Sequence, residues 1–243
     1  MMMVQACAHR GASGLAPENT MAAFRKALSF PFVQWMELDV QLSRDGVPVI
    51  IHDDTLRRTT TASGRVGEFT AAELGKFDAG AKFNKAFAGE GIPTLAELLD
   101  ETIGRARLNI ELKTYGGRYP ELERRVVELL YEKGLQHDAV ITSFDQQALR
   151  KVRALSKEIR TGIIIDGAPS TLVGDLRELE ANFLSLGHFF LSAPLVSVMK
   201  EEGVEIMVWT VNDAQTMRRL AGIHPGLMIC TNYPDRYAQA FGL

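Results

Sequence analysis

The sequence predicts a closed (β/α)8 barrel, a TIM barrel of the α/β class, formed by residues 1–243 as a single domain. Short apolar runs of β type alternate with helical patterns along nearly the whole chain, which is typical of parallel strands joined by crossover helices. The alternation repeats eight times in 243 residues, a length typical of one such barrel. Clusters of charged residues follow several of the apolar runs, where the carboxyl ends of the strands are expected.

The expected strands are short and largely apolar. They cover residues 4–8, 35–40, 108–112, 139–142, 161–165, 183–186, 205–210 and 227–231. The expected helices cover residues 20–28, 95–102, 119–133, 146–156, 171–180, 193–202, 214–221 and 233–241. Capping residues support the helix starts, since Asn19 or Thr20 can cap the first helix, and Asp145 and Asp213 directly precede two later ones.

Residues 53–92 interrupt the alternation. This segment carries turn residues and charges without a clear strand, and a stretch of that length in a compact domain usually has a function or minor structure of its own. We expect an insertion after the second strand, at the mouth of the barrel. A short strand over residues 47–51 is expected to lead into His52.

Composition narrows the class of protein. Apolar residues make up 46% and charged residues 23% of the chain, which fits a soluble globular protein. The formal charge of -3 comes without a basic patch, so we expect no nucleic-acid partner.

No apolar stretch reaches the length of about 18 residues needed to span a membrane. Residues 1–5 lack the basic and apolar regions of a signal peptide, so a cytoplasmic location is expected. The sequence leaves the oligomeric state open.

The chain has two cysteines, Cys7 and Cys230, which do not define a disulfide framework. They fall on the first and last expected strands, which are neighbours in a closed barrel. Free cysteine is commonly buried, so we expect two buried, reduced thiols that could lie close together.

Acidic residues recur at alternate positions on two expected strands. Glu37 and Asp39 project to one side of a strand, which in a barrel is the interior, and Glu111 and Lys113 repeat the spacing. Unpaired carboxylates in the interior are costly, so these groups need a proton, a cationic partner or a metal ion. Their oxygens suit Mg²⁺ or Ca²⁺ better than Zn²⁺. The alternative is a structural layer of ion pairs, with Lys113 on Glu111 and Arg10 on the other two carboxylates.

Two histidines each end an apolar run beside this acidic cluster. His9 and His52 could supply a general base and a general acid at one site. Arg10 and Lys113 would then bind the non-bridging oxygens of a phosphate group, since guanidinium and ammonium groups both serve this purpose. The other three histidines lie in loops or at helix ends without a supporting cluster.

These residues belong to a longer series of motifs in a fixed order. The series comprises His9-Arg10-Gly11, Pro17-Glu18-Asn19-Thr20, Glu37-Leu38-Asp39-Val40, His52-Asp53, Leu56-Arg57-Arg58-Thr59-Thr60, Asp78-Ala79-Gly80, Ile92-Pro93-Thr94-Leu95, Glu111-Leu112-Lys113, Ser143-Phe144, Trp209-Thr210-Val211-Asn212 and Thr231-Asn232-Tyr233-Pro234-Asp235. Through these motifs nearly the whole chain resembles the glycerophosphodiester phosphodiesterase family, in its bacterial cytoplasmic form.

The resemblance implies a TIM barrel that hydrolyses a glycerophosphodiester, a small-molecule substrate, to glycerol 3-phosphate and an alcohol. It implies one divalent cation, Mg²⁺ or Ca²⁺ with Mn²⁺ as a further candidate. The implied roles are metal binding by Glu37, Asp39 and Glu111, acid–base catalysis by His9 and His52, phosphate binding by Arg10 and Lys113, support at the rim by Glu18, and lining of the substrate pocket by Phe144 and Trp209. By analogy with related phospholipase barrels, His9 is the first base and His52 the first acid.

One position departs from the family pattern. The family often has Thr-Asp near the end of strand eight, where this chain has Thr231-Asn232, so one acidic group is absent from the mouth. Two other activities stay open. The same barrel could act on lysophospholipids or other phosphodiesters, for which an exposed apolar loop or a basic amphipathic helix at the mouth is expected. It could also bind phosphate ligands without catalysis, although such a protein would be expected to lack a histidine or a ligand carboxylate.

Overall fold

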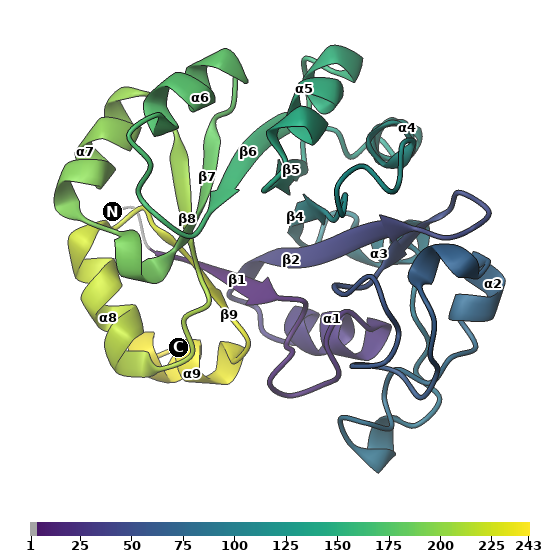
Figure 1. The fold of residues 1–243 in the computed structure, drawn as a ribbon. Helices are drawn as coiled ribbons and strands as arrows, with labels where there is room; N and C mark the ends of the chain where they lie inside the picture. Colours follow the sequence, from purple (N-terminus) through teal and green to yellow (C-terminus); the bar gives the residue numbers. More distant parts are fainter. Residues whose placement is uncertain (1–3) are drawn as a thin grey trace.

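The computed structural model describes residues 4–243 as a closed barrel of parallel strands surrounded by helices (Figure 1). Each barrel strand pairs in parallel with the next, and β1 pairs with both β2 and β9, which closes the sheet. The predicted fold class is confirmed. The eight barrel strands in this part of the chain are β1 (Gln5–His9), β2 (Val33–Leu42), β4 (Arg107–Leu112), β5 (Ala139–Ser143), β6 (Arg160–Ile165), β7 (Phe183–Gly187), β8 (Glu205–Trp209) and β9 (Met228–Thr231).

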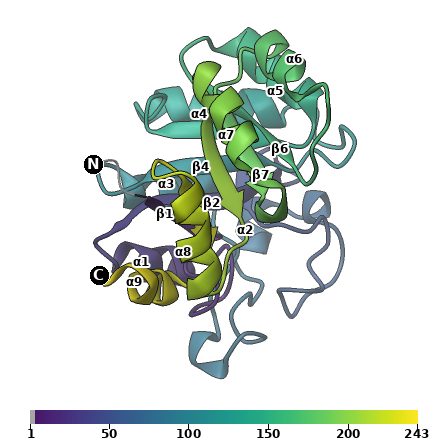
Figure 2. The same cartoon turned by 90° about the vertical axis from the view of Figure 1, so that its left-hand side faces the viewer.

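Helices cover the outside of the barrel between successive strands (Figure 2). They are α1 (Met21–Leu28), α3 (Leu95–Thr102), α4 (Leu122–Glu132), α5 (Gln146–Leu155), α6 (Leu172–Glu178), α7 (Ala193–Glu201), α8 (Ala214–Ile223) and α9 (Pro234–Phe241). The predicted caps are confirmed, with Thr20 rather than Asn19 capping α1. None of the helices described is both long enough and apolar enough to cross a bilayer.

Helix α4 begins at Leu122, three residues after the predicted start at Tyr119. Pro120 follows Tyr119 and disfavours a helical backbone at the residue before it. Tyr119 is instead buried, and its hydroxyl donates a hydrogen bond to Oε1 of Gln41 at 3.0 Å. The residues before the helix therefore serve to fix β2 rather than to extend α4.

The insertion lies to one side of the barrel, beside β2 (Figure 1). The expected short strand is β3 (Pro48–Ile50), which pairs antiparallel with β2 and so extends that strand as a hairpin. The rest of the insertion forms η1 (Val66–Glu68), α2 (Ala71–Leu74) and η2 (Lys85–Phe87). The insertion packs against β3 and the residue after it through a separate small apolar cluster, built from Val49, Ile51, Leu56, Val66, Leu74, Ala79 and Ile92.

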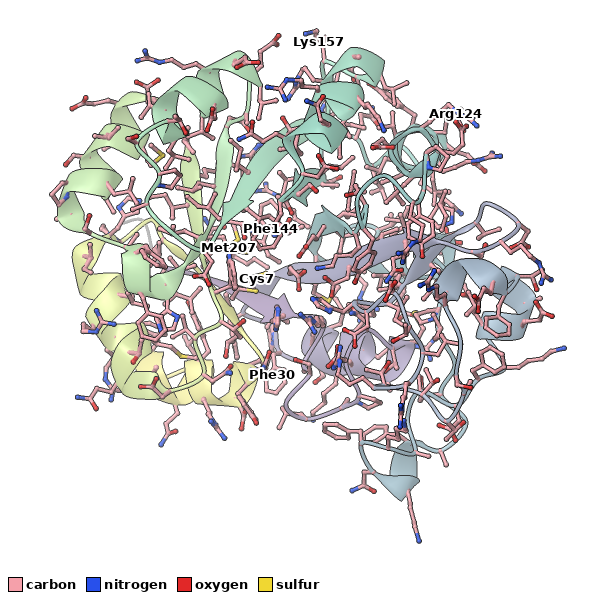
Figure 3. All side chains as sticks on the ribbon, viewed as in Figure 1. Cys7, Phe30, Arg124, Phe144, Lys157 and Met207 are labelled. Atoms are coloured by element: carbon pink, nitrogen blue, oxygen red, sulfur yellow. The ribbon has the colours of Figure 1, made fainter. Side chains whose placement is uncertain are left out.

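A separate apolar cluster fills the inside of the barrel below the charged residues. Cys7 and Cys230 lie in register on β1 and β9, and both are fully buried free thiols, as predicted. Figure 3 shows Cys7 and Met207 toward the middle of the barrel, with Phe144 nearby. The complete cluster contains Cys7, Trp35, Val140, Phe183, Met207, Met228 and Cys230. These side chains form an apolar floor beneath the polar groups at the carboxyl ends of the strands.

Candidate active site

The register of three neighbouring strands brings the predicted carboxylates together. His9 of β1 pairs with Glu37 of β2, and Asp39 of β2 pairs with Glu111 of β4. One oxygen from each of the three carboxylates lies within 4.8 Å of the other two. Glu37 and Asp39 are buried, with exposed fractions of 5% and 0%. Three acidic groups at this depth form a strongly negative cluster.

Two cations partly neutralise the cluster. The Nε atom of Arg10 lies 3.1 Å from Oδ2 of Asp39, and the Nζ atom of Lys113 donates to Oε1 of Glu111 at 2.7 Å. The backbone N–H of Arg10 also donates to Glu37. The layer of ion pairs anticipated as an alternative therefore exists, but it leaves one negative charge in excess when all three carboxylates are ionised. Among residues 4–243, Oδ1 of Asp39 is buried without a hydrogen-bond partner, and its nearest cation is the ammonium of Lys113 at 3.6 Å. A divalent cation fits this donor set.

The titration of the carboxylates reflects their crowding. Burial, followed by repulsion from Asp39, raises the pKa of Glu37 well above its ordinary value and that of Glu111 to about 7. Burial also opposes ionisation of Asp39, but Arg10 and Lys113 outweigh it and lower the pKa of that carboxyl. A cation held among the three groups would favour the ionised form of all of them.

His9 is held by a neutral amide. Its Nδ1 atom lies 2.6 Å from Oδ1 of Asn232, which also accepts a hydrogen bond from the Ser13 hydroxyl. Because an amide oxygen only accepts, the hydrogen bond assigns the ring proton to Nδ1, and Nε2 lies 3.7 Å from Oε2 of Glu37. Burial, helped by the charge of Arg10, lowers the pKa of His9 to about 4. The ring is therefore neutral near pH 7, with the lone pair of Nε2 directed toward the carboxylates.

His52 is held by a carboxylate. Its Nδ1 atom lies 2.7 Å from Oδ1 of Asp53, and Nε2 lies 3.1 Å from the ammonium of Lys113. The backbone oxygen of His52 accepts hydrogen bonds from the amide of Gln41 and the hydroxyl of Tyr115. Burial lowers the pKa of His52, although the charge of Asp39 opposes this. Contacts at both ring nitrogens and hydrogen bonds at the backbone oxygen thus hold His52 in place.

The predicted supporting residue Glu18 lies at the rim, where Oε1 accepts a hydrogen bond from Arg10 at 2.8 Å and the carboxylate also contacts Arg58. The structure adds further residues to those predicted from the sequence. The buried Asn19 donates from Nδ2 to Oδ2 of Asp39 at 2.9 Å. Asn19 belongs to the motif Pro17-Glu18-Asn19-Thr20, and its backbone φ of 57° suits asparagine. The contact of Asn232 with His9 and the contacts of Arg58 were not predicted.

A cavity of about 140 Å³ connects these groups. One part of its wall is charged, and the other is apolar and aromatic. Phe144 and Trp209 meet edge to face with ring centroids 6.0 Å apart, so the two predicted wall residues are neighbours. The lining residues are His9, Arg10, Glu37, His52, Asn109, Glu111, Lys113, Phe144, Ile164, Ser185, Met207, Trp209 and Cys230. Such a cavity can hold a phosphate group against the charged wall and an organic group against the rings.

The model of the glycerophosphoryl diester phosphodiesterase family matches residues 9–236, which include every residue of this site. The chain belongs to this family. The resemblance predicted from the motifs, and the prediction of an enzyme of this class, are therefore confirmed. Among curated members, the chain is 39% identical to a glycerophosphodiester phosphodiesterase of Caldanaerobacter subterraneus subsp. tengcongensis over 88% of each chain. It is 31% identical to one of Bacillus subtilis, covering 95% of this chain and 84% of that protein.

Solved structures of the family have the same fold. An Oleispira antarctica phosphodiesterase in complex with the product sn-glycerol-3-phosphate superposes with a TM-score of 0.92 at 34% identity, covering 99% of this chain and 98% of that one. A glycerophosphodiester phosphodiesterase of Agrobacterium tumefaciens superposes with a TM-score of 0.86 at 31% identity, covering 98% of this chain and all of that one. The barrel and its insertion are thus shared over nearly the full length of both relatives.

Proposed function

We propose that this chain hydrolyses glycerophosphodiesters to glycerol 3-phosphate and an alcohol, with one divalent cation held by Glu37, Asp39 and Glu111. The observation that carries the proposal is the convergence of these carboxylates, with a buried oxygen of Asp39 that has no hydrogen-bond partner, beside two histidines in one cavity. The product bound to the Oleispira relative supports the choice of substrate. Mg²⁺ and Ca²⁺ both suit the ligands, and Mn²⁺ is a further candidate. A bound cation would supply Lewis-acid stabilisation of the phosphate and orient the substrate.

Arg10 and Lys113 bind the non-bridging oxygens of the phosphate in this proposal. Both are already held in place, Arg10 by Glu18 and Lys113 by Glu111, so little side-chain freedom is lost when the substrate binds. Phe144 and Trp209 contact the organic part of the diester on the apolar wall. This division orients the scissile bond between the two histidines.

His9 acts as the first base in this proposal and His52 as the first acid. The neutral ring of His9 accepts a proton at Nε2 from the nucleophile, which is either water or the neighbouring hydroxyl of the substrate itself. The imidazolium form of His52 is stabilised by Asp53 and donates from Nε2 to the leaving alkoxide. When Nε2 of His52 carries this proton, Lys113 donates to Glu111 and the phosphate instead. The donated proton matters because an alcohol is a poor leaving group.

Hydrolysis of lysophospholipids is a second candidate, which one feature of the mouth favours. The turn η3 (His188–Phe190), directly after β7, exposes 83% of Phe189 and 39% of Phe190. An exposed apolar turn of this kind can contact the acyl chains of an interface. A silent binding barrel is disfavoured because both histidines and all three carboxylates are retained. The cytoplasmic location stays a prediction.

The test is release of glycerol 3-phosphate from glycerophosphocholine and glycerophosphoethanolamine. The protein is treated with EDTA, and Mg²⁺, Ca²⁺ or Mn²⁺ is then added back singly. We expect at least one cation to restore release, and Glu37→Ala and Glu111→Ala to lose it, while the exposed control Glu201→Ala retains it. Direct calorimetry should show weaker cation binding in both site variants.

Failure of every cation to restore release would contradict the proposal. A parallel assay with micellar lysophosphatidylcholine separates the two candidates. Faster turnover of the lysolipid than of soluble glycerophosphocholine would favour the second one.

A further inference from the structure

Arg58, in the first turn of the insertion, contacts the partners of two active-site residues. We propose that Arg58 is a positioning residue for hydrolysis, which joins the carboxylate that orients His52 to the carboxylate that holds Arg10. This inference rests on the function proposed above. It assigns a task in the reaction to the insertion, which otherwise lies outside the barrel (Figure 1).

The guanidinium of Arg58 binds two carboxylates at once. Its Nε atom donates to Oδ2 of Asp53 at 2.7 Å, and Nη2 donates to Oδ1 of the same residue at 3.0 Å. Its Nη1 atom donates to Oε2 of Glu18 at 2.7 Å, and Nη2 donates to Oε1 at 2.8 Å. Both pairs are bidentate, a geometry that fixes planar groups relative to one another. Each carboxylate in turn contacts an active-site side chain, Asp53 that of His52 and Glu18 that of Arg10.

These contacts leave Arg58 little capacity to bind a substrate. A guanidinium has five N–H donors, and four of them are used by Asp53 and Glu18. The one that remains on Nη1 cannot form the two parallel hydrogen bonds with which arginine usually binds phosphate. Arg58 therefore acts through the two carboxylates rather than on the diester.

The backbone around Arg58 is fixed. Leu56 and Thr60 are both fully buried on either side of it, and the backbone N–H and the hydroxyl of Thr60 both donate to the carbonyl of Leu56 at 2.9 Å. An isolated surface ion pair contributes little to stability. Arg58 is not part of such an isolated pair. It lies on an anchored turn in a network of four charged groups, so its position fixes the positions of the other three.

The consequence for the reaction follows from the bond between Asp53 and His52. Only one oxygen of Asp53 faces the imidazole, and without Arg58 the carboxylate could rotate and move Nε2 of His52 away from the leaving oxygen. Loss of a partner that orients a catalytic or metal-binding group typically costs about 10- to 100-fold in activity. We expect most of the loss in kcat, because proton donation is needed in the transition state and not for binding. A smaller rise in KM should accompany it, because Glu18 holds the phosphate-binding Arg10.

The experiment compares Arg58→Gln and Arg58→Lys with Arg57→Gln, a neighbouring exposed arginine whose side chain is not part of the network. On glycerophosphocholine we expect kcat to fall about 10- to 100-fold in Arg58→Gln, with partial recovery in Arg58→Lys and none of the loss in Arg57→Gln. In a double variant, Asp53→Asn with Arg58→Gln, the second change should cost much less than it does in the wild-type background, because both changes break the same connection to His52. Thermal melting confirms that each variant is folded. If Arg58→Gln melts below the assay temperature, Arg58→Lys replaces it in the double-variant comparison.

Three results would overturn the role of Arg58 while leaving the proposed function intact. They are a wild-type kcat in Arg58→Gln, a raised KM with an unchanged kcat, and additive losses in the double variant. A wild-type protein that releases no glycerol 3-phosphate with any cation would instead overturn the proposed function, and the assigned role with it. The two failures are therefore distinguishable from the wild-type assay alone.

Discussion

His9 and His52 both direct an imidazole Nε2 into the same cavity, but a neutral amide holds one ring and an ion-paired carboxylate holds the other. Asn232 fixes the proton on Nδ1 of His9 but brings no negative charge to the ring. Asp53 fixes the proton on Nδ1 of His52 and also stabilises a positive charge on that ring, and Arg58 holds Asp53 in place. A base must start neutral, and an acid must carry a proton that it can give up. The difference between the two partners thus favours His9 as base and His52 as acid.

The largest expected effect comes from removing either ring. On glycerophosphocholine, His9→Ala and His52→Ala should each lower kcat by about 10²- to 10⁴-fold. A p-nitrophenyl ester of glycerol 3-phosphate should separate the two variants, because p-nitrophenolate leaves without a proton. We expect His52→Ala to recover most of the wild-type rate on this ester, and His9→Ala to recover little.

The exposed His137, which lies outside the site, provides a matched control as His137→Ala. Equal losses in both site variants on both substrates would remove the distinction between base and acid. A wild-type rate of His52→Ala on glycerophosphocholine would exclude His52 from catalysis altogether.

Much of this site could be predicted from the sequence because it depends on local regularities. Alternate positions on a strand face one way, so Glu37 and Asp39 were expected to share a face, and apolar runs ending in charged residues marked the mouth. The extent of α4 and the antiparallel pairing of β3 were harder to predict from the sequence. Pro120 marked the residues before α4 as non-helical, but nothing in the sequence indicated that Tyr119 bonds with a residue 78 positions away.

The connecting contacts could not be predicted for the same physical reason. The bond from His9 to Asn232 spans 223 positions and exists only because the barrel closes β9 against β1. The bonds of Arg58 depend on the path of the insertion, for which no periodic pattern exists. Arg57 and Arg58 are adjacent and chemically identical, so only the structure shows which of them meets Glu18 and Asp53.

A smaller effect is expected from giving His9 the kind of partner that His52 has. In Asn232→Asp, the new carboxylate would stabilise the imidazolium and raise the pKa of His9 above its present value of about 4. The base would then stay protonated up to a higher pH. The rising limb of kcat/KM against pH should move to higher pH, with a loss of about tenfold on its acidic side and little loss at pH 8.

Asn232→Leu serves as the control for this change, since it removes the hydrogen bond without adding charge. It should lower kcat/KM above the limb and move the limb to lower pH, because the hydrogen bond with Asn232 raises the pKa of His9. A limb at the same pH in Asn232→Asp and wild type would show that His9 is not the group that titrates there.

The smallest expected effect is on thermal stability. Only the loss of Asp53, the partner of His52, should have an effect that depends on pH. Hydrogen bonds from Arg58, more than those from His52, lower the pKa of Asp53 from 3.8 to about 2. Because this pKa is lower in the folded chain than in the unfolded one, the ionised carboxylate stabilises the fold above about pH 4, and this contribution is lost as the pH falls toward 2. Asp53→Asn should therefore melt about 2–4 °C below wild type at pH 6 if the network contributes about 1 kcal/mol. The gap should close as the pH approaches 2. The neutral Asn232 supplies no such carboxylate, so the difference in melting temperature between Asn232→Leu and wild type should stay constant between pH 5 and 8.

A constant difference in melting temperature between Asp53→Asn and wild type from pH 6 down to pH 3 would show that Arg58 does not hold Asp53 ionised. The contrast between the two histidine partners would then have no electrostatic basis.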